Sequence, residues 1–142
     1  MRAWRAYVVG KAMLDSRLNH DLQQHHQLAL ADYELLVRLS EAPCGQARMS
    51  ILAEQVASSK SRISHQIGRM ERAGLVRRQE CPSDGRGVIA ELTSHGRRVL
   101  HSAAPTHVRG VRDHLIDLLS DEERTVLAEV FERVISRQRK LD

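Results

Sequence analysis

Residues 58–75, "SSKSRISHQIGRMERAGL", concentrate side chains that can donate hydrogen bonds to phosphates and to base edges. Ile63, Ile67 and Met70 recur at positions i, i+4 and i+7, which is the spacing of one apolar stripe on a helix. Such a helix can anchor itself through its apolar stripe and offer its polar face to a nucleic-acid groove. The candidate contacts on the polar face are Ser59, Lys60, Ser61, Arg62, Ser64, His65 and Arg69.

A second informative segment follows at residues 81–96, "CPSDGRGVIAELTSHG", which predicts a tight hairpin tip with a lone arginine. Proline and two glycines tighten the turn, so that Arg86 stands clear of the strands. A guanidinium held in this way fits a narrow minor groove, where the electrostatic potential is most negative. Asp84 lies two residues earlier and can restrain that side chain. Arg77 and Arg78 precede the tip on the first strand, so we expect them to contact phosphates rather than bases.

The distribution of charge favours a polyanionic partner. The 142-residue chain has a formal net charge of +4. Residues 51–98 carry nine Lys and Arg against five Asp and Glu, whereas residues 1–50 carry six against five and residues 99–142 carry seven against eight. A basic block between two nearly neutral ends is typical of a nucleic-acid-binding module on a neutral scaffold. A solvated basic surface without a ligand is the alternative interpretation.

The composition disfavours several classes of protein. No apolar run approaches the roughly 18 residues of a membrane span, and the N-terminus lacks the long apolar region of a signal peptide. Two cysteines without a CxxC spacing suit a reducing cytosol, so we expect a cytoplasmic protein with no membrane partner. No Gly-rich phosphate loop follows a strand, and no nucleophile elbow is present. The sequence therefore predicts no catalytic residue and no cofactor.

The elements that must position these side chains are mostly helices. Apolar periodicity predicts helices over residues 3–27 and 31–41, and "EAPCGQ" ends the second of them. Ser50 is expected to cap a short helix, "ILAEQVA". Ser59 then provides a cap for the helix with the polar face, and Gly74 should stop that helix.

The second half of the chain predicts a hairpin followed by two helices. "LVRRQEC" and "VIAELT" are predicted as short strands because the latter alternates with period 2. Thr93 is expected to cap a helix over residues 94–118 that Pro105 interrupts or bends. Ser120 and Glu123 form a capping box that opens a last helix, to about residue 138. This order predicts a mainly α protein with a small β-hairpin, arranged as a winged helix-turn-helix.

The sequence resembles the multiple-antibiotic-resistance regulator (MarR) family of bacterial transcription factors. Two stretches carry the resemblance, "LAEQVASSKSRISHQIGRMERAGLVRR" and "SDGRGVIAELTSHG". The second stretch has the family's wing pattern of Asp, any residue, Arg, then Leu-Thr and a Gly three residues after the Thr. In this chain the pattern falls on Asp84, Arg86, Leu92, Thr93 and Gly96. The flanking helix order also matches, so the resemblance covers nearly the whole chain.

The resemblance implies a homodimer that binds a palindromic operator and acts as a repressor. Residues 1–28 and 98–142 would form the helical dimerisation region, and residues 29–97 the winged helix-turn-helix module. Each recognition helix would enter a major groove, and Arg86, held in position by Asp84, would enter the minor groove. A small-molecule effector between the dimer and DNA modules would tune affinity. Aromatic residues that could line such a cleft are Trp4, Tyr7, Tyr33 and Phe131.

Three positions of the recognition helix match positions that face DNA in relatives of the family, namely Ser64, His65 and Arg69. The chain departs from the family pattern at two positions. His65 stands where arginine is frequent, which argues against strong guanine readout. Gly68 stands where aspartate is frequent, and it costs the helix up to roughly 1 kcal/mol relative to alanine.

Three alternatives keep the fold and change the mechanism. A metal-responsive regulator would use histidines such as His101, His107 and His114, but their spacings of six and seven are not the i, i+4 pair that best builds a zinc site. The sequence therefore predicts no metal ligand. A redox-responsive regulator would use Cys81, whose thiol the nearby arginines could activate. An architectural protein would bind DNA without operator preference.

Overall fold

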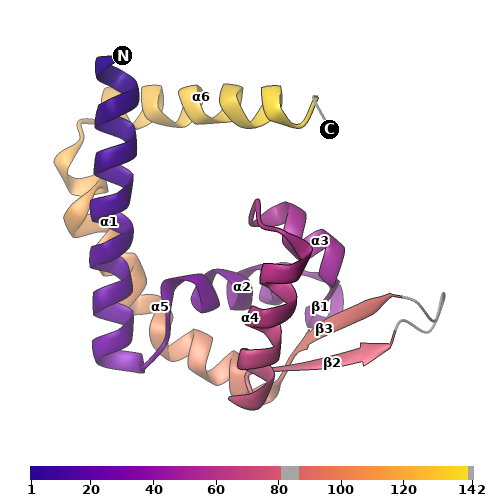
Figure 1. Ribbon diagram of the computed structural model, residues 1–142. Helices are drawn as coiled ribbons and strands as arrows, with labels where there is room; N and C mark the ends of the chain where they lie inside the picture. Colours follow the sequence, from indigo (N-terminus) through magenta and orange to yellow (C-terminus); the bar gives the residue numbers. More distant parts are fainter. Residues whose placement is uncertain (81–86, 141–142) are drawn as a thin grey trace.

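The computed structural model describes residues 1–80 and 87–140, which form helices and a small antiparallel sheet that lies at one side of the molecule (Figure 1). The predicted fold class is confirmed. No helix in these residues combines the length and the apolar character that crossing a membrane requires. The described elements are α1 (Arg2–His26), α2 (Leu30–Glu41), η1 (Pro43–Gly45), β1 (Gln46–Arg48), α3 (Met49–Gln55), α4 (Lys60–Arg72), β2 (Val76–Glu80), β3 (Val88–Leu92), α5 (Ser94–His114), η2 (Ile116–Leu118) and α6 (Asp121–Gln138).

Helix α2 lies at the centre of the core. Leu35, Leu36 and Leu39 on its inner face are at most 1% exposed. The residues that surround them are almost all aliphatic and include Leu52, Ile63, Ile67, Met70, Val76, Ala90 and Leu92. Because these come from α3, α4 and the sheet, the same apolar contacts hold all of these elements in one unit.

The sheet contains a strand that the sequence analysis did not predict. Strand β1 pairs antiparallel with β3, and the strand order is β1-β3-β2. Ala47 lies opposite Ala90 in that pairing. Pro43 and Gly45 were expected only to end α2, but they form η1 and lead directly into β1. A three-residue strand has too few positions for an alternating pattern to indicate it.

Helices α3 and α4 form the helix-turn-helix. Ser50 lies within α3, and Arg48 holds the N-cap position without a side-chain hydrogen bond, so the predicted Ser50 cap is wrong. Ser59 does cap α4, because its hydroxyl accepts a hydrogen bond from the backbone N–H of Arg62 at 3.2 Å. Gly74 follows the helix with φ of 73°, the left-handed conformation that glycine adopts without strain.

The start of α5 is fixed against the end of the helix-turn-helix. The Thr93 hydroxyl accepts a hydrogen bond from the Gly96 backbone N–H at 2.9 Å and donates to the carbonyl of Gly74 at 2.7 Å. Gly96 lies so close to Leu75 that a Cβ at position 96 would be 2.0 Å from the Leu75 carbonyl oxygen. Only glycine fits this contact, which explains the Gly three residues after the Thr.

Helices α1 and α5 pack against each other (Figure 1). Helix α1 leads into α2, and α5 leads from the sheet toward α6. Leu18 and Leu22 of α1 are buried. A Cβ at Gly110 of α5 would lie 2.8 Å from Leu18 Cδ2, so the two helices approach closely. Helix α5 was expected to reach residue 118 and to be interrupted or bent at Pro105. It runs through Pro105 without interruption, ends at His114, and is followed by η2.

Helix α6 begins with the predicted capping box. The Ser120 hydroxyl accepts from the Glu123 backbone N–H, and the Glu123 carboxylate accepts from the Ser120 backbone N–H at 2.8 Å. The ring of Phe131 lies 5.4 Å from the ring of Tyr7 near the start of α1. No residue of α6 is buried within the single chain, and the helix extends apart from α3 and α4 (Figure 1). Its exposed apolar residues are Val126, Val130, Val134 and Ile135.

Candidate nucleic-acid interface

The polar face of α4 is exposed, as the sequence predicts. Its apolar stripe is closed off from solvent, since Ile63 and Ile67 are 0% exposed and Met70 is 1% exposed. A helix anchored in this way cannot rotate about its axis without exposing the stripe, so its outer face is fixed. The predicted DNA contacts at the start and along the face of α4 are all exposed, and they are Ser59, Lys60, Ser61, Arg62, Ser64, His65 and Arg69.

Arg69 combines exposure with a fixed internal partner. Its Nη2 lies 2.6 Å from Oδ1 of Asp32 on α2, and Gln66 Nε2 donates to the same oxygen at 3.0 Å. Asp32 is 8% exposed, whereas the Arg69 side chain is 57% exposed. The guanidinium therefore reaches from a buried carboxylate to the surface of the recognition helix.

The two arginines of β2 also have carboxylate partners. Arg77 donates from Nη2 to Glu91 Oε2 at 2.6 Å, and Arg78 donates from Nε to Glu71 Oε2 at 2.7 Å. The hydrogen bond from the Arg77 side chain lowers the pKa of the Glu91 carboxyl, and the hydrogen bond from the Arg78 backbone does the same for the pKa of Glu71. Both arginine side chains are more than 40% exposed, so they can still approach a phosphate.

A hollow of about 330 Å³ lies between α4 and the sheet, and three elements place cations around it. Lys60 comes from α4, Arg78 from β2 and Arg48 from β1. The sequence analysis did not predict Arg48 as a candidate contact. The one signal for it in the sequence is its position just before the helix-turn-helix. The lining residues are Arg48, Met49, Ser50, Lys60, Ser64, Arg78, Gly87 and Val88.

The predicted tip of the wing lies outside the described residues. Asp84, Arg86 and Cys81 all fall in residues 81–86, so their roles rest on the sequence alone. The strands that lead to and from the tip are where the sequence predicts them. They pair antiparallel from Val76 opposite Leu92 to Glu80 opposite Val88.

A second hollow, of about 520 Å³, lies where α1, α2, α3 and α5 meet. The Tyr33 ring lies 4.5 Å from the ring of His107, and burial raises the pKa of Tyr33 and lowers the pKa of His107. Within the part of the chain that the structure describes, the buried His107 Nδ1 has no hydrogen-bond partner. The residues around this hollow are Lys11, Tyr33, Glu34, Val37, Arg38, Gln55, Val56, Ala57 and His107.

Of the aromatic residues predicted to line a ligand cleft, only Tyr33 borders this hollow. Trp4, Tyr7 and Phe131 lie instead where α1 meets α6, with ring centroids 5.9 Å apart for Trp4 and Tyr7. The hollow itself is therefore lined mainly by aliphatic and charged side chains.

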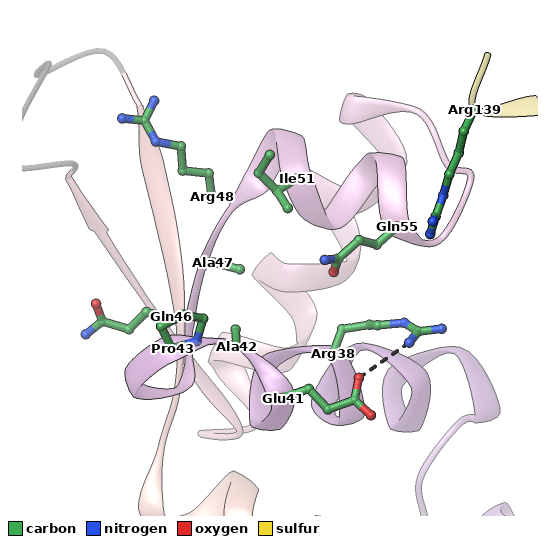
Figure 2. Close-up of a pocket in the computed structure, with 10 residues that line it drawn as sticks. All are labelled: Arg38, Glu41, Ala42, Pro43, Gln46, Ala47, Arg48, Ile51, Gln55 and Arg139. Carbon is green, nitrogen blue, oxygen red and sulfur yellow. Dashed lines mark hydrogen bonds and ion pairs between the residues drawn. The ribbon is translucent and has the colours of Figure 1, made fainter. Parts of the chain in front are cut away.

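A third hollow, of about 500 Å³, adjoins the second because Arg38 and Gln55 line both. Arg38 Nη1 lies 3.4 Å from Glu41 Oε2. Figure 2 shows Arg139, just beyond α6, pointing toward Arg38, whereas Arg48 points away toward the sheet. The two hollows therefore share part of their lining, and both lie beside α2.

The histidines and the described cysteine form no metal cluster in residues 1–80 and 87–140, where no group of three or more His, Cys, Asp or Glu side chains could hold an ion. His26 Nε2 lies 2.8 Å from Thr106 Oγ1. Cys44 is exposed and carries no disulfide.

Comparison with known proteins agrees with this architecture. The MarR family model matches residues 28–88. The crystal structure of AbsC, a MarR family transcriptional regulator from Streptomyces coelicolor, aligns with a TM-score of 0.90 and 46% identity over 97% of this chain and 93% of that chain. Sco3205, a MarR family regulator from the same organism solved in complex with DNA, gives a TM-score of 0.90 and 39% identity over 94% and 84% of the two chains.

A more distant curated relative spans the same region. The transcriptional regulator HosA of Escherichia coli O111:H- is 26% identical over 121 residues, which are 85% of each chain. The resemblance that rested on the recognition helix and the wing pattern is thereby confirmed. This chain belongs to the MarR family of transcriptional regulators.

Proposed function

We propose that this protein is a homodimeric repressor that binds a palindromic operator, with α4 of each copy in the major groove. The observation that carries the proposal is the anchored α4, whose polar face is exposed while its apolar stripe is at most 1% exposed. A fixed helix with donors on its outer face suits the major groove. The DNA complex of Sco3205, 39% identical to this chain, supports the same use here.

The contacts divide into two classes. Ser64 and His65 face base edges from the middle of α4, whereas Lys60 and Arg78 contact phosphates from the rim of the hollow beside it. The wing, with Asp84 and Arg86 at its tip, enters the minor groove. Further contacts come from Ser59, Ser61, Arg62, Arg69 and Arg77. A module that recognises a DNA sequence is expected to combine base contacts, which give specificity, with phosphate contacts, which give affinity.

The dimer is formed by residues 1–28 and 98–142, and residues 29–97 form the DNA-binding module. The exposed apolar residues of α6 support this division, because a second copy could cover them. A small effector could occupy the hollow where α1, α2, α3 and α5 meet, in which the His107 Nδ1 offers an unpaired polar atom among the described residues. Family membership supports a cytoplasmic regulator that binds rather than catalyses.

Selection from a random duplex library tests the proposal. The purified protein should enrich a sequence with two half-sites, and two chains should bind each duplex. Fluorescence anisotropy at physiological salt should give roughly 10³-fold tighter binding to the selected duplex than to a shuffled one. Binding to both duplexes within threefold would instead indicate an architectural protein without operator preference. Repression is tested by a reporter behind the selected site, which should be expressed more strongly without the protein.

The salt dependence of binding tests the phosphate contacts separately. Lys60→Ala should weaken binding to both duplexes by a similar factor and reduce the slope of log K against log salt by about one. Arg109→Ala is the matched control, because it removes one exposed cation from α5. If Lys60→Ala weakens binding to the selected duplex only, Lys60 contacts bases rather than phosphates.

A further inference from the structure

We propose that Asp32 is a positioning residue for DNA recognition, which sets base preference through α4 without contacting DNA. The inference rests on the proposed operator binding. It concerns a residue of α2 that faces the core rather than the predicted interface, and that no feature of the sequence singles out.

The geometry joins one buried oxygen to two side chains of the recognition helix. Asp32 lies in the first turn of α2 and is 8% exposed. Its Oδ1 accepts a hydrogen bond from Gln66 Nε2 at 3.0 Å and one from Arg69 Nη2 at 2.6 Å. Gln66 and Arg69 are three residues apart, so they are neighbours along one edge of α4.

Burial makes these two contacts hard to replace. A carboxylate that is removed from water needs hydrogen bonds or an opposite charge to offset its lost hydration. Within residues 1–80 and 87–140, the side-chain donors to Asp32 are those of Gln66 and Arg69, and both belong to α4. Rotation or translation of α4 relative to α2 would therefore leave a buried charge without partners, so Asp32 restricts the orientation of the recognition helix.

The ion pair also prepares Arg69 for binding. A guanidinium has five N–H donors, and the bond to Asp32 is made by Nη2. The Arg69 side chain is 57% exposed, so its other donors can face a base edge or phosphate while Asp32 holds the side chain in one conformation. Less side-chain entropy is then lost when DNA binds.

A purely structural role makes a different prediction. If Asp32 only held α2 to α4, its loss would lower the melting temperature and weaken binding to every duplex together. If it positions Arg69 and α4, its loss would reduce discrimination between duplexes. Removing one negative charge near a DNA-binding face would at the same time maintain or strengthen non-specific binding.

The test uses Asp32→Asn in the full-length protein, with the duplex selected by the wild type and its shuffled counterpart as probes. The ratio of the two affinities should fall about tenfold, and binding to the shuffled duplex should stay equal or become tighter. Glu54→Gln makes the same change of charge at an exposed residue of α3, and it should leave the ratio unchanged. A ratio within twofold of wild type for Asp32→Asn would overturn the inference.

A second variant keeps the test decisive if Asp32→Asn fails to fold. Arg69→Lys retains the charge at an exposed helical position but lacks the planar fork that serves Asp32 and DNA together. In Arg69→Lys the ratio of the two affinities should fall by a similar factor. In the double variant of Asp32→Asn and Arg69→Lys the ratio should fall no further than in either single variant. An Arg69→Lys protein with wild-type discrimination contradicts the inference. A wild type that enriches no sequence contradicts the proposed function instead.

Discussion

One carboxylate, that of Glu71 at the end of α4, is bound twice by Arg78 at the start of the wing. The backbone N–H of Arg78 donates to Glu71 Oε1 at 2.9 Å, and its Nε donates to Oε2 at 2.7 Å. Since Glu71 belongs to α4 and Arg78 to β2, these bonds fix the angle between the recognition helix and the wing. The relative placement of the two elements is therefore determined before any ligand binds.

Glu71→Gln should reduce stability in a pH-dependent way. Hydrogen bonds from Arg78 lower the pKa of the folded Glu71 carboxyl below its ordinary value of 4.5. Glu71 thus contributes stability above about pH 4.5, and this contribution is lost as the pH falls through the lower, folded-state pKa. Because the pair is partly exposed, the expected loss at pH 7 is only about 0.5–1 kcal/mol.

Urea denaturation of both proteins at pH 7 and pH 3.5 measures this difference, with Glu54→Gln as the exposed control. The gap between wild type and Glu71→Gln should narrow at the lower pH. A gap that is the same at both pH values would show that the folded and unfolded carboxyl groups titrate alike.

Gly96→Ala should be strongly destabilising. Its Cβ would meet the backbone carbonyl oxygen of Leu75 at 2.0 Å, so either α5 or the end of the helix-turn-helix must move. We expect a loss of about 3 kcal/mol or more, as for other overpacked sites that cannot relax. Gly68→Ala is the matched helical control, since its Cβ would meet only the end of Arg72 at 3.9 Å, and it should gain up to about 1 kcal/mol. Thermal unfolding of the two variants checks this, and equal melting temperatures would refute the close contact at Gly96.

His107→Phe should make the protein less sensitive to mild acid. Burial lowers the pKa of His107 below its ordinary value of 6.5, so the unfolded chain binds a proton more readily than the folded chain. Stability should therefore decline as the pH falls through 6.5. Phenylalanine keeps a ring against Tyr33 and removes the buried Nδ1, so stability should rise by about 1 kcal/mol near pH 5.5.

Chemical denaturation at pH 8 and pH 5.5 separates the outcomes for His107. The exposed His101→Phe on the same helix is the control. If His107→Phe loses as much stability as wild type between the two pH values, another group causes the decline.

Val130→Asp should prevent dimerisation while leaving α6 helical. Val130 is 37% exposed in the single chain and lies one turn from Val126 and Val134. A carboxylate buried between two copies without a partner would cost several kcal/mol. Sedimentation velocity should show a monomer with unchanged helical circular dichroism. Ala128→Asp, about 160° around the same helix from Val130, should stay dimeric, and a dimeric Val130→Asp would place the interface elsewhere.

Arg86→Ala should weaken binding to the selected duplex about tenfold or more, because a guanidinium is lost from the minor groove. The melting temperature and the oligomeric state should not change, since the substitution lies in the predicted turn. Arg109→Ala again controls for the lost charge. If anisotropy titrations give the same affinity for Arg86→Ala as for the wild type, Arg86 does not contribute to the DNA interface.

Local patterns in the sequence were sufficient for most of the fold. The stripe of Ile63, Ile67 and Met70, the Ser59 cap and the Ser120 capping box each depend on residues within a few positions of one another. The structure confirms them for that reason. The Ser50 cap failed because a favourable cap residue does not by itself set where a helix begins, and α3 starts before it.

The sequence alone did not predict contacts between residues that are far apart along the chain. Strand β1 forms only because β3 lies beside it, and a three-residue segment carries no signal of its own. The Asp32–Arg69 pair joins residues 37 positions apart, and its burial depends on the packing of α2. Pro105 was expected to interrupt or bend α5, and the helix is not interrupted there.

Methylation protection on the selected duplex tests the central claim most directly, because dimethyl sulfate reports guanine N7 in the major groove and adenine N3 in the minor groove. The bound protein should protect guanine N7 in two clusters about one helical turn apart, with adenine N3 protected beside them. Full reactivity of every guanine N7 on a duplex that the protein demonstrably binds would show that α4 does not enter the major groove.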